Sequence, residues 1–187
     1  MPETLHPLAP LTFPLHGSRL IEASAGTGKT WTIAALVVRL VLGHGGANAF
    51  APQGQPCPLQ PAQILVMTFT RAATRELSER IRARLVEAAA CFRGHSVGDD
   101  FLHDLLATYP EATQREQAAW RLELAAQGMD DAAIFTIDAW CQRVLREHAR
   151  DSGSLLDETL EADEAQRLTE TLQDYWRQQC YPCLLNT

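Results

Sequence analysis

A single lysine lies inside a short segment of small residues near the start of the chain. Of the 16 basic residues, 15 are arginine and only Lys29 is lysine. The segment ASAGTGKT, residues 23–30, fits the pattern G-x-x-x-x-G-K-[ST], except that alanine replaces glycine at the first position. Arginine carries a broad planar fork, whereas lysine carries a slim point charge on a flexible stem. The pattern therefore predicts a loop that wraps closely around phosphate groups.

The residue types in this loop predict how it would hold a nucleoside triphosphate. Gly26 and Gly28 let the backbone turn, so that successive N–H groups face phosphate oxygens. Lys29 is expected to reach the β- and γ-phosphates, and the Thr30 hydroxyl to bind Mg²⁺. Lys29 and Thr30 are therefore the candidate catalytic residues, with ATP and Mg²⁺ as cofactors. The full set of candidate nucleotide-binding residues in the loop is Ala23, Ser24, Ala25, Gly26, Thr27, Gly28, Lys29 and Thr30.

The segments on either side of the loop are expected to position it. Residues 18–22 (SRLIE) predict a short apolar strand that ends at the loop. Residues 30–42 are apolar nearly all round, which predicts a helix buried on most sides. The N-terminus of that helix would present its positive dipole end to the bound anion.

Two further strand-to-helix units follow. Residues 63–69 form a nearly continuous apolar run, as expected for a central parallel strand. A helix is predicted over 71–92, with apolar positions at helical spacing and arginines on the other faces. Residues 132–137 predict a third strand, and a helix to about 149 follows, with Asp138 as its predicted N-cap.

Helices are also expected at about 98–108, 110–127 and 157–180, the second with Pro110 at its first position. The alternation of strands and helices predicts an α/β fold, a parallel sheet covered by helices on both faces. Three predicted strands are few for such a sheet, so the fold is expected to be incomplete.

The charge distribution is uneven. The net charge of −7 argues against a protein that coats nucleic acid non-specifically. Residues 71–93 hold six arginines against three glutamates, a local charge of +3, whereas residues 150–187 hold three arginines against eight acids, a local charge of −5. Taken alone, the basic helix is most simply interpreted as a solvated face.

The cysteines and the apolar runs suggest a cytoplasmic protein. Five cysteines, at 57, 91, 141, 180 and 183, are an odd number and are mostly far apart, which predicts reduced thiols. Cys180 and Cys183 form a C-x-x-C, but no second pair lies nearby to complete a tetrahedral zinc site. No apolar run approaches the roughly 18 residues that span a bilayer, and the first residues do not resemble a signal peptide.

Two segments after the predicted strands resemble a known family. TFTRAATRELSERIRARL begins at Thr68 and TIDAWCQRVL begins at Thr136. They resemble motifs Ia and Ib of UvrD-type superfamily 1A DNA helicases, in the order seen there, with the phosphate loop as motif I. The resemblance covers nearly the whole chain, including the glycine-rich insert and the late DYWRQQCYP, and is closest to helicase–nuclease members. It implies a RecA-like P-loop NTPase motor domain, incomplete, at 1–149, and the start of a helical accessory (insertion) domain at 150–187.

The resemblance also implies which residues line a DNA path. These are Thr68, Phe69, Thr70, Arg71, Thr136 and Trp140. The Phe69 ring could stack on a base, and the threonine hydroxyls could bind phosphates. The alternative for Phe69 is a core aromatic, and the alternative for Trp140 is burial in a packed helix.

Two positions depart from the family pattern. His16 stands where the family usually has a glutamine that reads adenine, so it is a candidate nucleotide contact with less secure adenine selectivity. Asp138 stands where motif Ib usually has histidine, and an exposed carboxylate there would repel DNA phosphate.

The resemblance implies an ATP-driven DNA helicase and exonuclease that acts on double-stranded DNA ends in recombinational repair, with two partner subunits. The family places the Walker B acids, the arginine fingers and the second motor domain beyond residue 187. This piece alone is therefore expected to bind ATP weakly without turning it over. Two alternatives remain open: a self-contained P-loop phosphotransferase that uses Asp138 as its Walker B acid, and a non-enzymatic remnant that binds a nucleotide or a partner protein.

Overall fold

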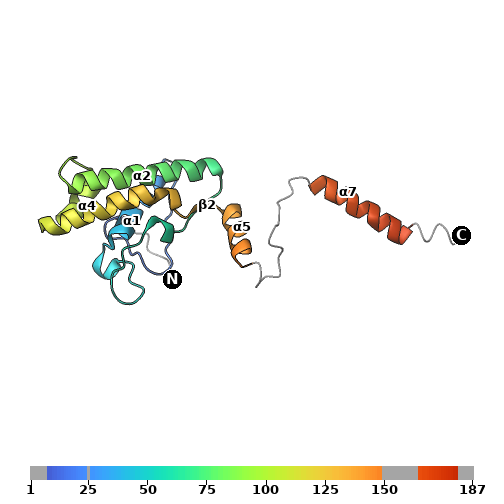
Figure 1. Cartoon of the computed structure of the whole chain (residues 1–187), viewed down its shortest axis with the longest axis horizontal. Coiled ribbons are helices and arrows are strands. Elements are labelled where there is room, and N and C mark those ends of the chain that lie inside the picture. Colours follow the sequence, from blue (N-terminus) through green and yellow to red (C-terminus); the bar gives the residue numbers. More distant parts are fainter. Residues whose placement is uncertain (1–7, 25, 149–163, 181–187) are drawn as a thin grey trace. The chain divides into compact units, whose positions relative to one another are not determined.

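The computed structural model describes residues 8–24, 26–148 and 164–180, and the chain divides into two compact units, residues 1–141 and 142–187 (Figure 1). The elements are, in chain order, α1 (Lys29–Leu42), β1 (Val66–Thr68), α2 (Arg71–Phe92), α3 (Asp100–Ala107), α4 (Ala112–Gln127), β2 (Ile134–Thr136), α5 (Ile137–Glu147) and α7 (Glu164–Tyr175). Short 3₁₀ turns occupy η1 (Gly46–Asn48), η2 (Pro61–Gln63) and η3 (Gly128–Asp131), and a π-helical turn, η4 (Trp176–Cys180), extends α7.

The core of the first unit lies among α1, α2 and α4. Figure 1 shows α2 and α4 side by side along most of their length, and α1 contacts both helices. The buried residues of α1 lie all round the helix, which confirms the prediction from its apolar sequence. The largest fully buried apolar side chains are Val38, Ile81, Leu85, Leu102, Leu105 and Leu122.

The sheet is parallel but small. β1 pairs with β2, with Thr68 opposite Thr136, and the sheet of the described residues has these two strands. The strands predicted within residues 63–69 and 132–137 are confirmed and run parallel, and the mostly helical structure is consistent with the α/β class. The complete RecA-like sheet with helices on both faces stays a prediction. The prediction that residues 63–69 form a buried central strand is wrong, because Met67 is 51% exposed. Alternate side chains point to opposite faces: Val66 packs against the core. Met67 lies on the other face with its register partner Phe135, which is partly covered by Trp140.

The predicted strand over residues 18–22 is absent. This segment runs before the phosphate loop without strand structure, and the Leu20 side chain is 79% exposed. A strand is held by ladder hydrogen bonds to a neighbour. Residues 18–22 pair with neither β1 nor β2, so nothing holds this backbone in a ladder.

Two helix starts differ from the predictions. Thr136, not Asp138, caps α5: its hydroxyl accepts a hydrogen bond from the Ala139 N–H at 3.2 Å. The extended backbone of β2 ends at Thr136, and an N-cap residue needs that conformation. Asp138 is an exposed residue in the first turn. Pro110 is not the first residue of α4, because the helix begins after Glu111, whose extended backbone occupies the N-cap position.

Arg39 ties the first residues of the described chain to α1. Its side chain is fully buried, and Nη1 donates to the carbonyls of Pro10 and Phe13, both at 2.7 Å. Nε donates to Nδ1 of His44 at 3.4 Å. Burial and the adjacent Arg39 charge lower the pKa of His44 to about 4. The neutral imidazole can therefore accept this hydrogen bond at neutral pH.

The second unit contains α7, which confirms the predicted last helix from residue 164 onward; residues 157–163 lie outside the described part. The domain boundary predicted at 149/150 stays a prediction. The side chain of Cys183 also lies outside that part, whereas Cys57, Cys91 and Cys141 are free thiols. Within the described ranges, no helix has the length and apolar character that crossing a bilayer would take.

Candidate nucleotide and DNA site

The phosphate loop depends on glycine at two positions. Gly26 has φ 79° and Gly28 has φ 82°, in the left-handed region that favours glycine. A Cβ added at either position would meet no atom within 4 Å. The requirement for glycine is therefore set by the backbone conformation, and the space beside both residues is open to a ligand.

The loop leads directly into an uncapped helix. Gly28 is the N-cap of α1 and offers no side-chain hydrogen bond, and the first turn carries no acidic residue. The first N–H groups of a helix have no partner within the helix. Together with the dipole, these groups suit an anion.

The Lys29 ammonium folds back over the loop. Nζ donates to the carbonyls of Ser24 at 2.6 Å and Ala23 at 3.1 Å, and the Thr27 hydroxyl donates to the same Ser24 carbonyl at 2.8 Å. The lysine is exposed, so a triphosphate could compete with these carbonyls for its charge. Ala25 lies outside the described residues.

The residues present fit Mg·ATP in their chemistry. Thr30 follows Lys29 in the first turn of α1 and is partly buried, which places a hydroxyl beside the anion-accepting N–H groups. A hydroxyl and phosphate oxygens are ligands that Mg²⁺ accepts. The described part of the chain contains no cluster of three or more His, Cys, Asp or Glu that could hold a metal by itself. The phosphate oxygens of the nucleotide would therefore supply most of the negative charge around the ion.

A buried arginine lies under the first turn of α1. Arg84 of α2 has a side chain only 6% exposed, and its Nη2 reaches both carboxylate oxygens of Asp99, at 2.8 and 2.7 Å. Its guanidinium carbon lies 5.3 Å from the ring of Trp31 and 5.4 Å from the ring of Phe101. Nε1 of Trp31 donates to Asp99 at 3.2 Å. These four side chains, Trp31, Arg84, Asp99 and Phe101, are called the Trp31 clamp below.

Sequence reasoning missed the clamp. It placed the arginines of residues 71–92 away from the apolar face, which is wrong for Arg84. The signal was present: Leu77, Ile81, Leu85 and Ala88 define the buried stripe, and Arg84 falls on it at the i+3 position from Ile81. An arginine in a core stripe requires a partner for its charge. Asp99, the N-cap of α3, supplies it.

The clamp holds Asp99 ionised. Burial raises the pKa of its carboxyl, but hydrogen bonds from Arg84, from the Leu102 N–H and from Trp31, with the Arg84 charge, outweigh burial and hold the pKa below its usual value. The contacts of the clamp therefore persist over the neutral pH range.

The candidate DNA residues of both motifs meet at one edge of the sheet. Thr68 and Thr136 are register partners at the carboxyl ends of the two parallel strands. Phe69, the next residue after β1, is 88% exposed, so the alternative of a core aromatic does not hold. Arg71 is the exposed first residue of α2. This edge presents a ring, a guanidinium and two strand ends together.

The threonine hydroxyls at this edge already have structural partners. Thr70 caps α2 by accepting from the Ala73 N–H at 3.1 Å. The Thr68 hydroxyl lies 2.5 Å from that of Thr74, and Thr136 caps α5 and is nearly buried. Contacts from these hydroxyls to DNA phosphate stay predictions. Each hydroxyl would have to bind the phosphate in addition to its present hydrogen-bond partner.

The two remaining candidate residues, Trp140 and His16, differ in how far they are exposed. The Trp140 ring is half-buried against Phe135, with centroids 5.8 Å apart, so packing takes part of its surface. His16 is exposed in a bend, and the neighbouring Leu15 N–H donates to the Asn48 carbonyl at 2.8 Å. Adenine contact by His16 stays a prediction.

The positive charge of α2 is largely neutralised along the helix. Ion pairs join Arg80 to Glu76, Arg82 to Asp130, Arg84 to Asp99 and Glu87, and Arg93 to Glu123. Exposed pairs of this kind add little stability, but they cancel the local field. The local charge of +3 therefore does not make α2 an open basic stripe.

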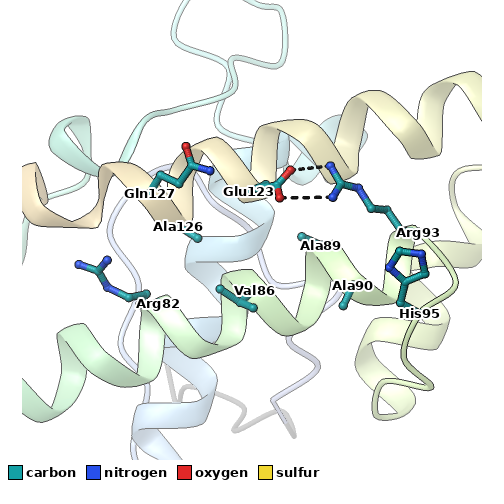
Figure 2. Close-up of a pocket in the computed structure, with 9 residues that line it drawn as sticks. All are labelled: Arg82, Val86, Ala89, Ala90, Arg93, His95, Glu123, Ala126 and Gln127. Atoms are coloured by element: carbon teal, nitrogen blue, oxygen red, sulfur yellow. Dashed lines mark hydrogen bonds and ion pairs between the residues drawn. The ribbon is translucent and has the colours of Figure 1, made fainter.

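A groove lies between α2 and α4, away from both candidate sites. It encloses about 420 Å³ over a floor that includes Val86, Ala89 and Ala126, and the ion pair of Arg93 with Glu123 spans it (Figure 2). None of its residues belongs to the phosphate loop or to the strand edge. This groove is therefore separate from the candidate nucleotide and DNA residues.

The chain belongs to the UvrD/REP helicase family: the N-terminal domain of that family matches residues 7–182. It is 47% identical over 183 residues to the RecBCD enzyme subunit RecB of Escherichia coli (strain K12), covering 97% of this chain and 15% of that relative. It is 40% identical over 186 residues to RecB of Haemophilus influenzae, again 97% and 15%. RecB of Mycolicibacterium smegmatis is 37% identical over 139 residues. The chain thus spans about 15% of the length of the first two relatives.

Proposed function

We propose that this chain is the ATP- and Mg²⁺-binding N-terminal part of the motor of an ATP-dependent DNA helicase and exodeoxyribonuclease of the exodeoxyribonuclease V type. The parent hydrolase would act on double-stranded DNA ends in DNA repair and recombination, with two further subunits, gamma and alpha. Residues 1–149 would form part of the first motor domain, and residues 150–187 the start of its helical insertion. A cytoplasmic location stays a prediction.

The observation that carries this proposal is the loop at residues 23–30. It places the chain's one lysine beside an uncapped helix N-terminus, with two glycines in left-handed conformation and open space next to them. A polyanion is the ligand that such a site accepts. Membership of the helicase family supports a nucleoside triphosphate as that polyanion.

The test is Mg·ATP binding by the 187-residue chain and by Lys29→Ala. Removing the ammonium deletes a charge-assisted hydrogen bond worth about 1.5–3 kcal/mol, so the dissociation constant should rise about 10- to 100-fold. Arg146→Ala, which removes an exposed positive charge outside the loop, is the matched control and should bind as the unaltered chain does. Equal binding by Lys29→Ala and the unaltered chain would remove the basis of the proposal.

The DNA part of the proposal concerns the strand edge. Phe69 offers an exposed ring next to Arg71, and base stacking on such a ring is worth about 1–3 kcal/mol. Phe69→Ala should therefore weaken binding of a single-stranded oligonucleotide about 5- to 150-fold. Val97→Ala is the control, because Val97 is 80% exposed and lies elsewhere. Fluorescence anisotropy of a labelled oligonucleotide measures both, and an unchanged affinity for Phe69→Ala would exclude stacking on this ring.

The alternative of a self-contained phosphotransferase depends on Asp138 as a Mg²⁺-binding acid. Asp138 lies in the first turn of α5, two residues beyond the end of β2, and is exposed. Asp138→Asn discriminates: loss of Mg²⁺-dependent turnover would favour the phosphotransferase, and no effect would favour the helicase part. Tight ATP binding without any DNA affinity would instead favour a non-enzymatic remnant.

A further inference from the structure

Trp31, which follows Lys29 and Thr30 in the chain, contacts three side chains of other elements. Trp31 donates from Nε1 to Asp99 at 3.2 Å, and its ring face lies 5.3 Å from the guanidinium carbon of Arg84. Phe101 meets the ring edge-on, with centroids 5.7 Å apart. An indole held at its nitrogen, on its face and by a neighbouring ring has little freedom to rotate.

The partners of Trp31 are themselves fixed to other elements. Arg84 belongs to α2, and its Nη2 donates to both carboxylate oxygens of Asp99 while Nη1 donates to Glu87 at 2.8 Å. Asp99 also caps α3 by accepting from the Leu102 N–H at 3.0 Å. The Trp31 clamp therefore joins three helices at one point, directly beneath the start of α1.

The periodicity of α1 connects this clamp to the ligand side. Successive helical residues are about 100° apart, so Trp31 and Lys29 project on roughly opposite sides of the first turn. Turning the helix so that Trp31 leaves its seat would turn Lys29 and the uncapped N–H groups away from the loop. The Trp31 side chain is 39% exposed but held by its three contacts, so its orientation and that of Lys29 change together when the first turn rotates.

We propose that Arg84 and Asp99 are positioning residues of the triphosphate site, acting through Trp31 to fix the rotation of the first turn of α1. The inference rests on the proposed nucleotide function. It assigns a site-directed role to the ion pair of the buried Arg84 with Asp99, whose side chain is 37% exposed. Arg84 lies in the segment that resembles motif Ia, but it is not among the residues that the resemblance places on the DNA path. The effect on binding should concern the β- and γ-phosphates, because Lys29 is expected to reach these two groups.

A comparison of ATP and ADP binding can therefore distinguish a residue that positions Lys29 from one that only stabilises the fold. A variant that only loosens the domain weakens ATP and ADP binding by the same factor. A variant that misdirects Lys29 loses the advantage of the γ-phosphate, so the ratio of the ADP to the ATP dissociation constant falls. The ratio, not the affinity alone, is the measurement.

The experiment uses the full 187-residue chain and the variants Arg84→Lys and Trp31→Phe. Arg84→Lys keeps the charge but loses the planar guanidinium that binds Asp99 and Glu87 through separate nitrogens and lies over the two rings. Trp31→Phe keeps an aromatic ring but loses the hydrogen bond to Asp99. Arg82→Lys is the control, because Arg82 lies on the same helix and its ion pair with Asp130 is exposed. Isothermal titration with Mg·ATPγS and Mg·ADP gives the ratio, and circular dichroism establishes that each variant is folded.

We expect the ADP-to-ATP ratio to fall about tenfold in Arg84→Lys and about threefold in Trp31→Phe, the size expected for losing one or part of one charged hydrogen bond. Arg82→Lys should keep the ratio. If Arg84→Lys does not fold, Trp31→Phe decides alone. An unchanged ratio in folded variants overturns the inference while leaving the nucleotide site in place. Failure of the unaltered chain to bind either nucleotide overturns the proposed function, and the inference with it.

Discussion

At the scale of single residues, two arginines that a sequence would place at the surface organise the interior. Arg39 is fully buried and Arg84 has a side chain 6% exposed. Burying a charge is costly unless it is paired and hydrogen-bonded. Arg84 is paired with carboxylates, whereas Arg39 donates to backbone carbonyls and the neutral ring of His44. Among the described residues, Nη2 of Arg39 and Nε of Arg84 are buried without a hydrogen-bond partner. Desolvation lowers the pKa of Arg39.

The close packing of Arg39 against Gly45 predicts that a substitution at this glycine lowers stability. Gly45 has φ 135°, and a Cβ added there would lie 2.7 Å from Nη2 of Arg39 and 2.9 Å from the Ala49 nitrogen. Gly45→Ala should therefore lower the free energy of unfolding by about 2–4 kcal/mol, from backbone strain and overpacking together. Gly54→Ala is the control, because Gly54 also has positive φ but has no atom within 4 Å of the added Cβ. Urea denaturation measures both, and equal losses would mean that the clash with Arg39 is unimportant.

At the scale of elements, the same corner occurs twice. Each parallel strand leads into a helix that a threonine caps: Thr70, two residues after β1, caps α2, and Thr136, the last residue of β2, caps α5. Because the strands are parallel and in register at Thr68 and Thr136, both helix starts lie at one edge of the sheet. The two sequence motifs thus become one surface through strand pairing.

The cap of α2 can be tested by removing one hydroxyl. Thr70→Ala should destabilise the chain by about 1 kcal/mol, because the Ala73 N–H loses its acceptor. Thr70→Asp should recover most of this loss, since aspartate is also a good N-cap and suits the helix dipole. Thr113→Ala, near the exposed start of α4, serves as the control and should change stability little. Thermal melts of the variants compare these values, and a neutral Thr70→Ala would exclude a capping role.

At the scale of the whole molecule, the chain holds a nucleotide loop and a strand edge but spans about 15% of the length of its relatives. A motor of this class needs an acid to polarise water and arginines to stabilise the transferred phosphoryl group. Among the described residues, the first turn of α1, beside Lys29 and Thr30, carries no acid that could fill this role. We expect the purified 187-residue chain to bind Mg·ATP weakly and to show no DNA-stimulated ATP hydrolysis.

A steady-state phosphate-release assay with and without single-stranded DNA checks this expectation. Lys29→Ala serves as the background, because it removes the charge on which we propose that nucleotide binding depends. DNA-stimulated turnover by the unaltered chain that disappears in Lys29→Ala would show that the fragment carries a complete catalytic set.

The sequence alone was sufficient for features that depend on local patterns. The helix that starts at Lys29, the helix Arg71–Phe92 and the parallel relation of the strands were all predicted, because apolar periodicity and loop glycines are read over a few neighbouring residues. The glycine loop was also recognisable, since a backbone that turns with positive φ restricts the residue type. The residue-by-residue roles at the loop and at the strand edge stay predictions.

Tertiary structure decided what depends on partners distant in the chain. Residues 18–22 lack a strand because a ladder needs a neighbour, and Met67 is exposed because its face of the sheet is only partly covered, at Phe135 by Trp140. Arg84 finds Asp99 only when α2 and the start of α3 come together beneath Trp31. Burial, ion pairing and strand pairing each join residues that local spacing does not relate, which is why the clamp and the sheet edge emerged only from the folded chain.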